Sequence, residues 1–174
     1  MKHRLPVETE VKLRIPAADA VAPMLQALGF APVAPAQEEV SVLWDRGGEL
    51  RARGSALRVR RYAGRCILTF KGPRTPDPLL KVRPEWETSV EDAGALEAIL
   101  SALGYAPALT MVKTRATWAR EELEACVDET PFGCFLELEG EPAAIKLAMQ
   151  GLALDASHVE PRSYAALYGG PAED

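Results

Sequence analysis

The sequence of 174 residues has no excess of positive charge and no long hydrophobic run. Its formal net charge of −5 argues against a general nucleic-acid-binding protein, because no basic surplus is available to neutralise phosphates. No apolar stretch approaches the roughly 20 residues that a membrane-spanning helix needs, and the N-terminus lacks the apolar core of a signal peptide. We therefore expect a cytoplasmic protein with neither a membrane nor a nucleic acid as partner.

Cysteine and histidine are scarce. Cys66, Cys126 and Cys134 are odd in number and have no metal-ligand spacing, so we expect small packing residues in a reducing compartment. The two histidines, His3 and His158, lie in no recognisable site. A catalytic histidine is therefore not expected.

The sequence is instead rich in like charges that stand two residues apart. A spacing of two places both side chains on one face of a β-strand. Apolar residues alternate with them, as Val11 and Leu13 do around Lys12, so each strand is predicted to have one charged and one apolar face. The five pairs are Glu8 and Glu10, Arg58 and Arg60, Glu85 and Glu87, Lys113 and Arg115, and Glu137 and Glu139.

Periodicity and turn residues predict an α+β fold in one domain over residues 1–174. Strands are expected near 5–15, 37–45, 56–62, 65–71, 82–90, 108–119, 122–129 and 133–140. Helices are expected near 17–28, 92–103, 142–150 and 162–168, loops at 47–54 and 72–78, and a frayed end at 169–174.

One segment of the sequence resembles another. Leu28–Pro32 and Leu103–Pro107 both carry Leu-Gly-aromatic-Ala-Pro after an apolar helical pattern. Glycine just past a helix is a common stop signal, and the rest of the similarity predicts two related strand–helix–strand halves.

The direction of the charged faces decides the function. For any single strand, a solvated charged face is the simplest interpretation. The pairs, however, are segregated by sign, whereas solvated faces mix signs. About eight strands with covering helices are enough to close a barrel, whose charged faces would line a tunnel. The charges nearly balance: seven are basic and seven acidic, namely Lys12, Arg58, Arg60, Lys71, Arg83, Lys113 and Arg115 against Glu8, Glu10, Glu85, Glu87, Asp128, Glu137 and Glu139.

Such a tunnel must be wet or hold a charged ligand, because each unpaired buried ion costs several kcal/mol. Arginine and lysine suit phosphate oxygens, and carboxylates suit hard divalent cations. The charge pattern therefore predicts a site for a metal and a polyphosphate.

These residues resemble the motifs of the CYTH superfamily, which contains class IV adenylyl cyclases, thiamine triphosphatases and inorganic triphosphatases. The matching elements run the length of the chain in order: Glu8–Lys12 (ExExK), Leu57–Arg60 (LRxR), Leu68–Pro73 (TFKGP), Lys81–Glu87 (RxExE), Val112–Arg115 (KxR), Asp128 with Gly133–Glu139 (GxFxExE), and Ser163–Tyr164.

The resemblance implies an eight-stranded antiparallel β-barrel, or triphosphate tunnel, with helices packed outside. It implies Mg²⁺ or Mn²⁺ as cofactor, a small-molecule triphosphate as substrate, and it is compatible with a homodimer. The implied metal ligands are Glu8, Glu10, Glu137 and Glu139, with Asp128 and Glu85 or Glu87 as ligands or outer partners. The implied phosphate contacts are Lys12, Arg58, Arg60, Lys71, Arg83, Lys113 and Arg115; Glu8, Glu10, Lys12, Glu137 and Glu139 form the expected catalytic set.

The segment Ser41–Asp45 departs from the family pattern. Ser41 stands where many relatives have aspartate, which leaves the role of this strand open. Trp44 and Trp86 are expected to pack against helices.

Three functions remain open at this point. The leading hypothesis is metal-dependent hydrolysis of inorganic, nucleoside or thiamine triphosphate. The alternative is cyclisation of ATP to cyclic AMP and pyrophosphate, which needs nearly the same residues. A non-catalytic polyphosphate or nucleotide sensor is the third.

Overall fold

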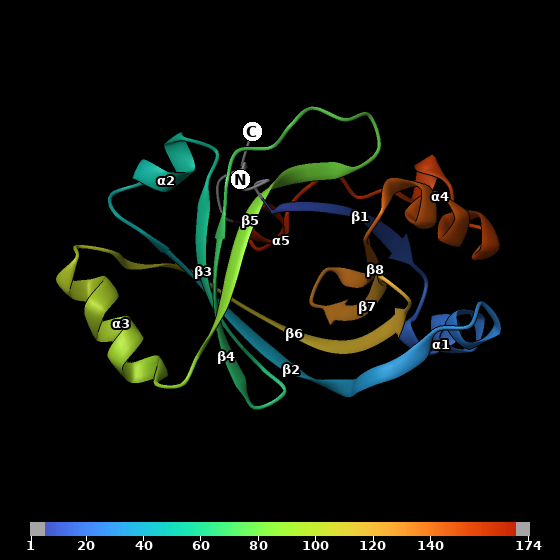
Figure 1. Cartoon of the computed structure of the whole chain (residues 1–174), viewed down its shortest axis with the longest axis horizontal. Helices are drawn as coiled ribbons and strands as arrows, with labels where there is room; N and C mark the ends of the chain where they lie inside the picture. The colour runs from blue at the N-terminus through green and yellow to red at the C-terminus, as the bar shows by residue number, and fades with distance from the viewer. Residues whose placement is uncertain (1–5, 170–174) are drawn as a thin grey trace, which may run out of the picture.

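The computed structural model describes residues 6–169, in which eight strands close an antiparallel β-barrel (Figure 1). Around the barrel the strands follow the order β1-β5-β4-β3-β2-β6-β7-β8, and β8 pairs with β1. The predicted fold class is therefore confirmed. The strands are β1 (Val7–Ile15), β2 (Ala31–Asp45), β3 (Ala56–Tyr62), β4 (Arg65–Lys71), β5 (Lys81–Val90), β6 (Ala106–Arg120), β7 (Leu123–Thr130) and β8 (Gly133–Glu139).

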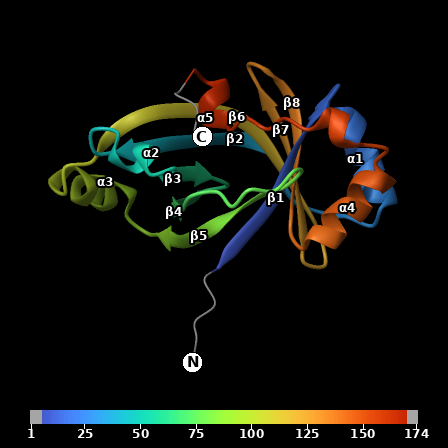
Figure 2. The same cartoon turned by 90° about the horizontal axis from the view of Figure 1, so that it is seen from above.

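Helices lie outside the barrel, as expected. Figure 1 shows α1 and α4 on one side and α3 on the other, and Figures 1 and 2 together place α5 over one end. No helix within residues 6–169 is long and apolar enough to cross a membrane. The helices are α1 (Ala18–Ala27), α2 (Glu49–Ala52), α3 (Ala93–Ala102), α4 (Pro142–Gly151), the 3₁₀ turn η1 (Ala156–His158) and α5 (Tyr164–Leu167).

The apolar faces of the strands form two cores outside the barrel. The larger core packs Leu25 of α1 and Ile145 of α4 on residues such as Leu136 of β8. The smaller core packs Leu100 of α3 on Trp44 and Val59. Because apolar side chains are buried outside, the alternating charged side chains must point into the barrel.

The two halves of the chain are related, as the repeated segment predicted. Exchanging β1–β4 with β5–β8 leaves the strand order of the barrel unchanged. After α1, the amide of Phe30 donates to the carbonyl of Leu25, and after α3 the corresponding residues Tyr105 and Leu100 make the same bond. Arginine guanidinium groups pack on both rings, Arg120 on Phe30 and Arg46 on Tyr105.

The observed elements differ from the predicted ones in a few places. Strand β2 begins at residue 31 rather than near 37, and the expected loop 47–54 contains the short helix α2. Asp45 explains this helix, because its carboxylate accepts hydrogen bonds from the amides of Leu50 and Arg51. The final helix is shorter than expected, and most of the expected frayed end, 170–174, lies outside the described residues.

The two tryptophans have different environments. Trp44 is buried in the core beneath α3, as expected. Trp86 is 43% exposed, so it does not pack beneath a helix. Its ring instead lies 5.9 Å from that of Phe70 on the neighbouring strand β4.

Candidate active site

Nearly all predicted site residues meet inside the barrel. Of the fourteen, all but Asp128 line one or both of two cavities inside the described part of the barrel. The strand registers explain this convergence: Glu8 faces Arg83 across β1 and β5, and Glu137 faces Lys12 across β8 and β1. Lys12 and Glu137, which lie 125 positions apart in sequence, are thus brought to one site by the closure of the barrel.

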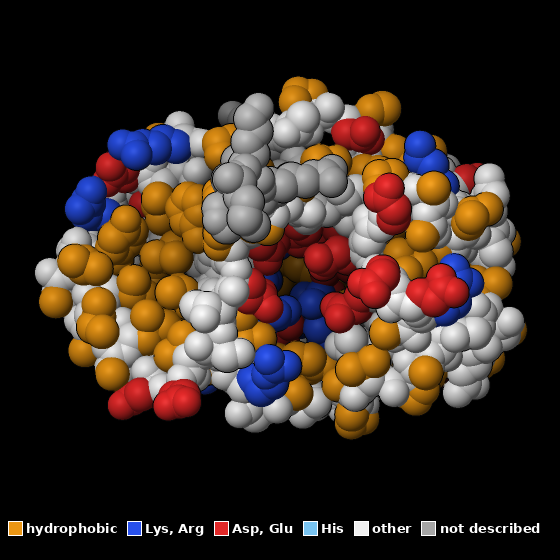
Figure 3. All heavy atoms as spheres, in the orientation of Figure 1, with side chains coloured by type: hydrophobic (Ala, Val, Ile, Leu, Met, Phe, Trp, Pro, Cys, Tyr) orange, Lys and Arg blue, Asp and Glu red, His pale blue; other side chains and the backbone are white. Residues whose placement is uncertain are grey.

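The two cavities differ in charge. A cavity of about 710 Å³ lies toward the end where β1 begins and is lined, among the described residues, by eight glutamates and five cationic side chains. A smaller cavity of about 90 Å³ lies beside α5 and is lined by seven cationic side chains and three glutamates. Figure 3 shows acidic side chains around an opening, with basic side chains deeper inside. The charges are therefore segregated along the barrel.

A row of carboxylates crosses three neighbouring strands at the acidic end. Glu139 pairs with Glu10 on one side and with Glu124 on the other. Burial, together with the charges of Glu8 and Glu10, raises the pKa of Glu139 to about 8. Divalent cations prefer such oxygen ligands, and a bound cation would relieve this repulsion. The chemistry of the donor set therefore fits Mg²⁺ or Mn²⁺.

These carboxylates are turned toward cationic side chains in this structure. The ammonium of Lys71 lies 2.6 Å from Glu8, and Arg115 lies 2.5 Å from Glu137. Lys81 lies 3.4 Å from Glu10. Within residues 6–169 no three carboxylate, histidine or cysteine side chains are arranged to hold a metal ion. Metal binding therefore requires the glutamates to exchange their cationic partners for the metal.

Asp128 lies among cations. It is fully buried, and its oxygens accept hydrogen bonds from Lys113 at 2.9 Å, Arg115 at 2.7 and 2.6 Å, and the hydroxyl of Tyr164 at 2.5 Å. Both oxygens of the carboxylate are thus occupied. Of the two predicted roles, ligand or outer partner, this geometry favours the outer partner.

Lys12 is a deeply buried charge of the site. Its side chain is 1% exposed, and its ammonium makes no hydrogen bond to any described residue. Burial, together with the charge of Lys81, lowers the pKa of Lys12 to about 7. The ammonium instead lies over the ring of Tyr164, 3.8 Å from its centroid. An unpaired buried cation of this kind is suited to an incoming anion.

Glu39 is a functional candidate that the sequence analysis missed. It is buried on β2, 3.6 Å from both Lys113 and Arg115, and accepts a hydrogen bond from Ser41. Burial alone would raise the pKa of Glu39, but Arg115 and Lys113 lower it to about 2. The replacement of aspartate by Ser41 suggested that this strand carries no carboxylate. Glu39, two residues earlier on the same strand, supplies one. Its alternation with Ser41 is the signal that could have indicated it.

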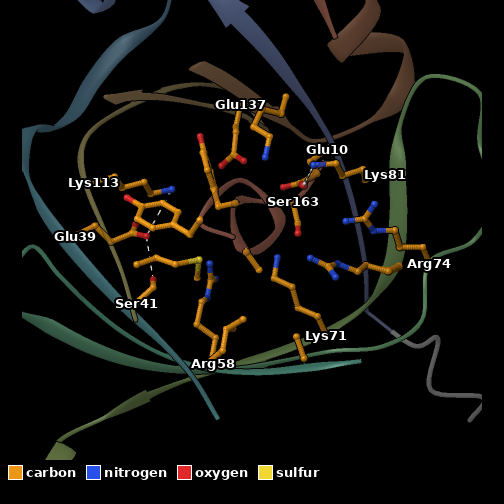
Figure 4. A pocket seen from close by; sticks show the side chains of 18 residues that line it. Glu10, Glu39, Ser41, Arg58, Lys71, Arg74, Lys81, Lys113, Glu137 and Ser163 are labelled. Carbon is orange, nitrogen blue, oxygen red and sulfur yellow. Dashed lines mark hydrogen bonds and ion pairs between the residues drawn. The ribbon is translucent and has the colours of Figure 1, made fainter. Parts of the chain in front are cut away.

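Other site residues were also missed. Glu122 and Glu124 line the acidic cavity, and their spacing of two is the same signal that identified the other pairs. Arg74 and Lys81 line the cationic cavity, and Figure 4 shows both pointing inward. Arg74 comes from the expected loop between β4 and β5. In a loop, the alternation of residues does not predict whether a side chain points into the barrel.

Comparisons with known proteins agree with this geometry. A model of the CYTH domain matches residues 6–158. A protein of Methanocaldococcus jannaschii named "putative adenylate cyclase" is 31% identical over 134 residues, which cover 76% of each chain.

Solved structures are similar over nearly the whole chain. A Vibrio parahaemolyticus protein described as a "putative adenylate cyclase" superposes with a TM-score of 0.84 and 20% identity, covering 96% of this chain and 100% of the other. A Hippeastrum protein described as a "putative adenylyl cyclase" with a dominant triphosphatase activity superposes with a TM-score of 0.67 and 21% identity, covering 94% and 97%. The chain therefore belongs to the CYTH family, whose members are adenylyl cyclases or triphosphatases.

Proposed function

We propose that this protein is a divalent-metal-dependent hydrolase of small triphosphates, which bind inside the barrel. The observation that carries this proposal is the meeting of a cationic cavity with a row of glutamates inside one closed barrel. A polyphosphate needs many cationic contacts, and its hydrolysis needs a metal held by oxygen ligands beside it.

The proposed metal ligands are the carboxylates of the acidic pairs. In this proposal Glu8, Glu10, Glu137 and Glu139 hold Mg²⁺ or Mn²⁺, with Glu85, Glu87 and Asp128 as outer partners. When bound, the metal neutralises charge on the phosphate oxygens and activates water. A nearby glutamate orients the attacking water and accepts its proton.

The cationic side chains hold the phosphate chain in line for displacement. Arg58, Lys71 and Arg83 line the cationic cavity from β3, β4 and β5. Lys12 and Lys113 reach the same cavity from β1 and β6. Arg60 and Arg115 line the acidic cavity, where they neutralise phosphate charge nearest the metal ligands.

Adenylyl cyclase activity is the second candidate, and the name of the Methanocaldococcus relative favours it. In that reaction the ribose 3′-hydroxyl, rather than water, attacks the α-phosphate. The Hippeastrum protein, described as having a dominant triphosphatase activity, favours hydrolysis as the first candidate.

The products of the reaction distinguish the candidates. The purified protein is incubated with inorganic tripolyphosphate, ATP or thiamine triphosphate, in Mg²⁺ or Mn²⁺. Release of orthophosphate supports the hydrolase. Formation of cyclic AMP and pyrophosphate without orthophosphate would contradict it and support the cyclase. Tight binding without turnover would support the sensor.

A homodimer remains a proposal as well. Ile99 of α3 and Leu103 just after this helix are exposed, and Trp86 is exposed on the nearby strand β5. Figure 3 shows a broad group of hydrophobic side chains on the side of the molecule where α3 lies. Light scattering of the wild type and of Ile99→Glu tests it; a monomeric mass for the wild type would contradict it.

We also propose that the protein works in the cytoplasm. Cys66, Cys126 and Cys134 are all free thiols. Burial raises the pKa of the Cys126 thiol to about 12, so this cysteine is a packing residue rather than a nucleophile. Cell fractionation tests the location.

A further inference from the structure

The ring of Tyr164 lies beside two lysines that the proposed function requires. The ammonium of Lys12 lies 3.8 Å from the ring centroid, and that of Lys113 lies 4.1 Å from it. Ammonium groups over an aromatic ring are attracted by its quadrupole, more strongly where water is excluded. One tyrosine thus contacts two like charges inside the barrel.

The hydroxyl of Tyr164 fixes the orientation of the ring. It donates a hydrogen bond of 2.5 Å to Asp128, whose other donors include Lys113. The ring also makes a T-shaped contact with Phe135, at 5.7 Å between centroids. Tyr164 therefore joins residues of β7 and β8 to the two lysines of β1 and β6.

The segment that carries Tyr164 is anchored to the barrel. The amide of Glu160 donates to the carbonyl of Lys12 at 2.8 Å. The hydroxyl of Tyr168 donates to the carbonyl of Val112, and Ser163 caps α5 by accepting from the amide of Ala166. The ring is thus held in place from both ends of the segment.

The two lysines need such a support because carboxylates compete for them. Among residues 6–169, Lys12 has no hydrogen-bond partner, and Glu137 and Glu10 attract its charge. Glu39 lies 3.6 Å from Lys113. Lys113 already donates to Asp128 at 2.9 Å. Without the ring, Lys12 would turn toward Glu137 or Glu10, since an unpaired buried charge is costly, and Lys113 would be drawn further toward Asp128 and Glu39. Neither ammonium would then face the cavity.

We propose that Tyr164 is a positioning residue, whose aromatic face holds Lys12 and Lys113 toward the phosphate chain of the substrate. This inference rests on the proposed function, since it assumes that phosphates bind in the cationic cavity. The hydroxyl has the lesser task of orienting the ring through Asp128. The ring itself carries the effect on binding.

Calorimetric titration with inorganic tripolyphosphate, in the absence of divalent metal, tests this proposal. Tyr164→Phe keeps the ring and is expected to bind within about threefold of the wild type. Tyr164→Leu removes the ring, and its affinity is expected to fall about tenfold, as the loss of two desolvated cation–π contacts predicts. Tyr105→Leu is the matched control, because Tyr105 contacts Arg46 outside the barrel and its loss should leave binding unchanged.

The outcomes are distinct. Wild-type affinity in Tyr164→Leu would overturn the proposal, and so would an equal loss in Tyr164→Phe. If the leucine variant does not fold, Tyr164→Met fills the space without an aromatic face and carries the same expectation. A role in folding alone would reduce the fraction of active protein and leave KM unchanged, whereas the positioning role raises KM.

The same measurements distinguish a failure of the proposed function from a failure of the role proposed for Tyr164. A wild type that binds tripolyphosphate but never hydrolyses it would contradict the hydrolase, and the affinities of the Tyr164 variants would still decide the role of the ring. A wild type that does not bind tripolyphosphate would overturn both.

Discussion

The ammonium of Lys71 donates hydrogen bonds to both carboxylate oxygens of Glu8, at 2.6 and 2.8 Å. Lys71 is a proposed phosphate contact and Glu8 a proposed metal ligand. The ammonium and the carboxylate are thus paired with each other. This ion pair must break before Lys71 can bind phosphate or Glu8 can bind a metal ion. Phosphate and metal should therefore favour each other, because each releases the partner that the other needs.

Removing Lys71 should affect the two ligands in opposite directions. In Lys71→Met, the affinity for tripolyphosphate is expected to fall about tenfold or more, the usual loss for a charge-assisted contact. The affinity for Mn²⁺ measured without phosphate should rise, because Glu8 loses its closest cationic partner and keeps only the longer contact with Arg83, at 3.4 Å. Calorimetry and electron paramagnetic resonance of Mn²⁺ measure both.

Arg53→Met is the control for that experiment, since it removes one positive charge that pairs with Glu49 outside the barrel. It should change neither affinity. A fall of Mn²⁺ affinity in Lys71→Met would contradict the exchange of partners.

Neutralising a proposed metal ligand should abolish metal-dependent turnover. Glu8→Gln and Glu137→Gln are each expected to lose about a hundredfold or more in kcat, which corresponds to ~2.7 kcal/mol of transition-state stabilisation. Circular dichroism should show both variants folded. Glu97→Gln on α3, which breaks a surface pair with Arg61, should retain full activity. Activity near that of the wild type in both site variants would refute the metal assignment.

Arg74 should contribute to substrate binding although it comes from a loop. Its guanidinium points into the cationic cavity (Figure 4). Arg74→Ala is expected to lower kcat/KM for tripolyphosphate about tenfold, the scale of one hydrogen bond to a charged group. Lys146→Ala, an exposed site on α4, is the control. Equal steady-state kinetics for the two variants would remove Arg74 from the site.

Stability should depend on pH through Glu160, which is 3% exposed. Hydrogen bonds from Arg162, and the contact with Arg14, lower the pKa of Glu160 from 4.5 to about 2. A lowered folded-state pKa stabilises the fold above the unfolded value, and this contribution is lost as the pH falls toward 2. The effect is about 2 kcal/mol, since both arginines are partly solvated.

Urea denaturation of the wild type and of Glu160→Gln measures this contribution. The difference in unfolding free energy should be full at pH 7 and should be largely lost close to pH 2, where the carboxyl of Glu160 is about half protonated even in the folded state. A difference that is independent of pH would contradict the ion-pair account.

The barrel could be predicted because apolar and charged residues alternate strictly along its strands. Where apolar residues such as Val11 and Leu13 lie outside, the charges between them must lie inside. The ends of α3 could also be predicted from the sequence. Asp92 caps the helix by accepting a hydrogen bond from the amide of Ala95, and Gly104 ends it with a positive φ.

Other parts of the site depend on contacts that alternation does not encode. Helix α2 forms because Asp45 binds amides five and six residues later, which no local preference of residues 47–54 indicates. Glu39 and Glu124 are different, because alternation with Ser41 and with Glu122 did indicate them, and they were missed only because they stand in no familiar motif. The support that Tyr164 gives to Lys12 joins α5 to β1 across most of the chain, so it becomes visible only when the barrel is closed.

Orthophosphate release from inorganic tripolyphosphate is the most direct measurement of the central claim. The assay is run on the wild type in Mg²⁺ or Mn²⁺, and again with excess EDTA. We predict multiple turnovers with metal, none with EDTA, and full recovery when the metal is restored. Turnover that is unaffected by EDTA, or no turnover of tripolyphosphate, ATP or thiamine triphosphate with either metal, would contradict a metal-dependent triphosphatase.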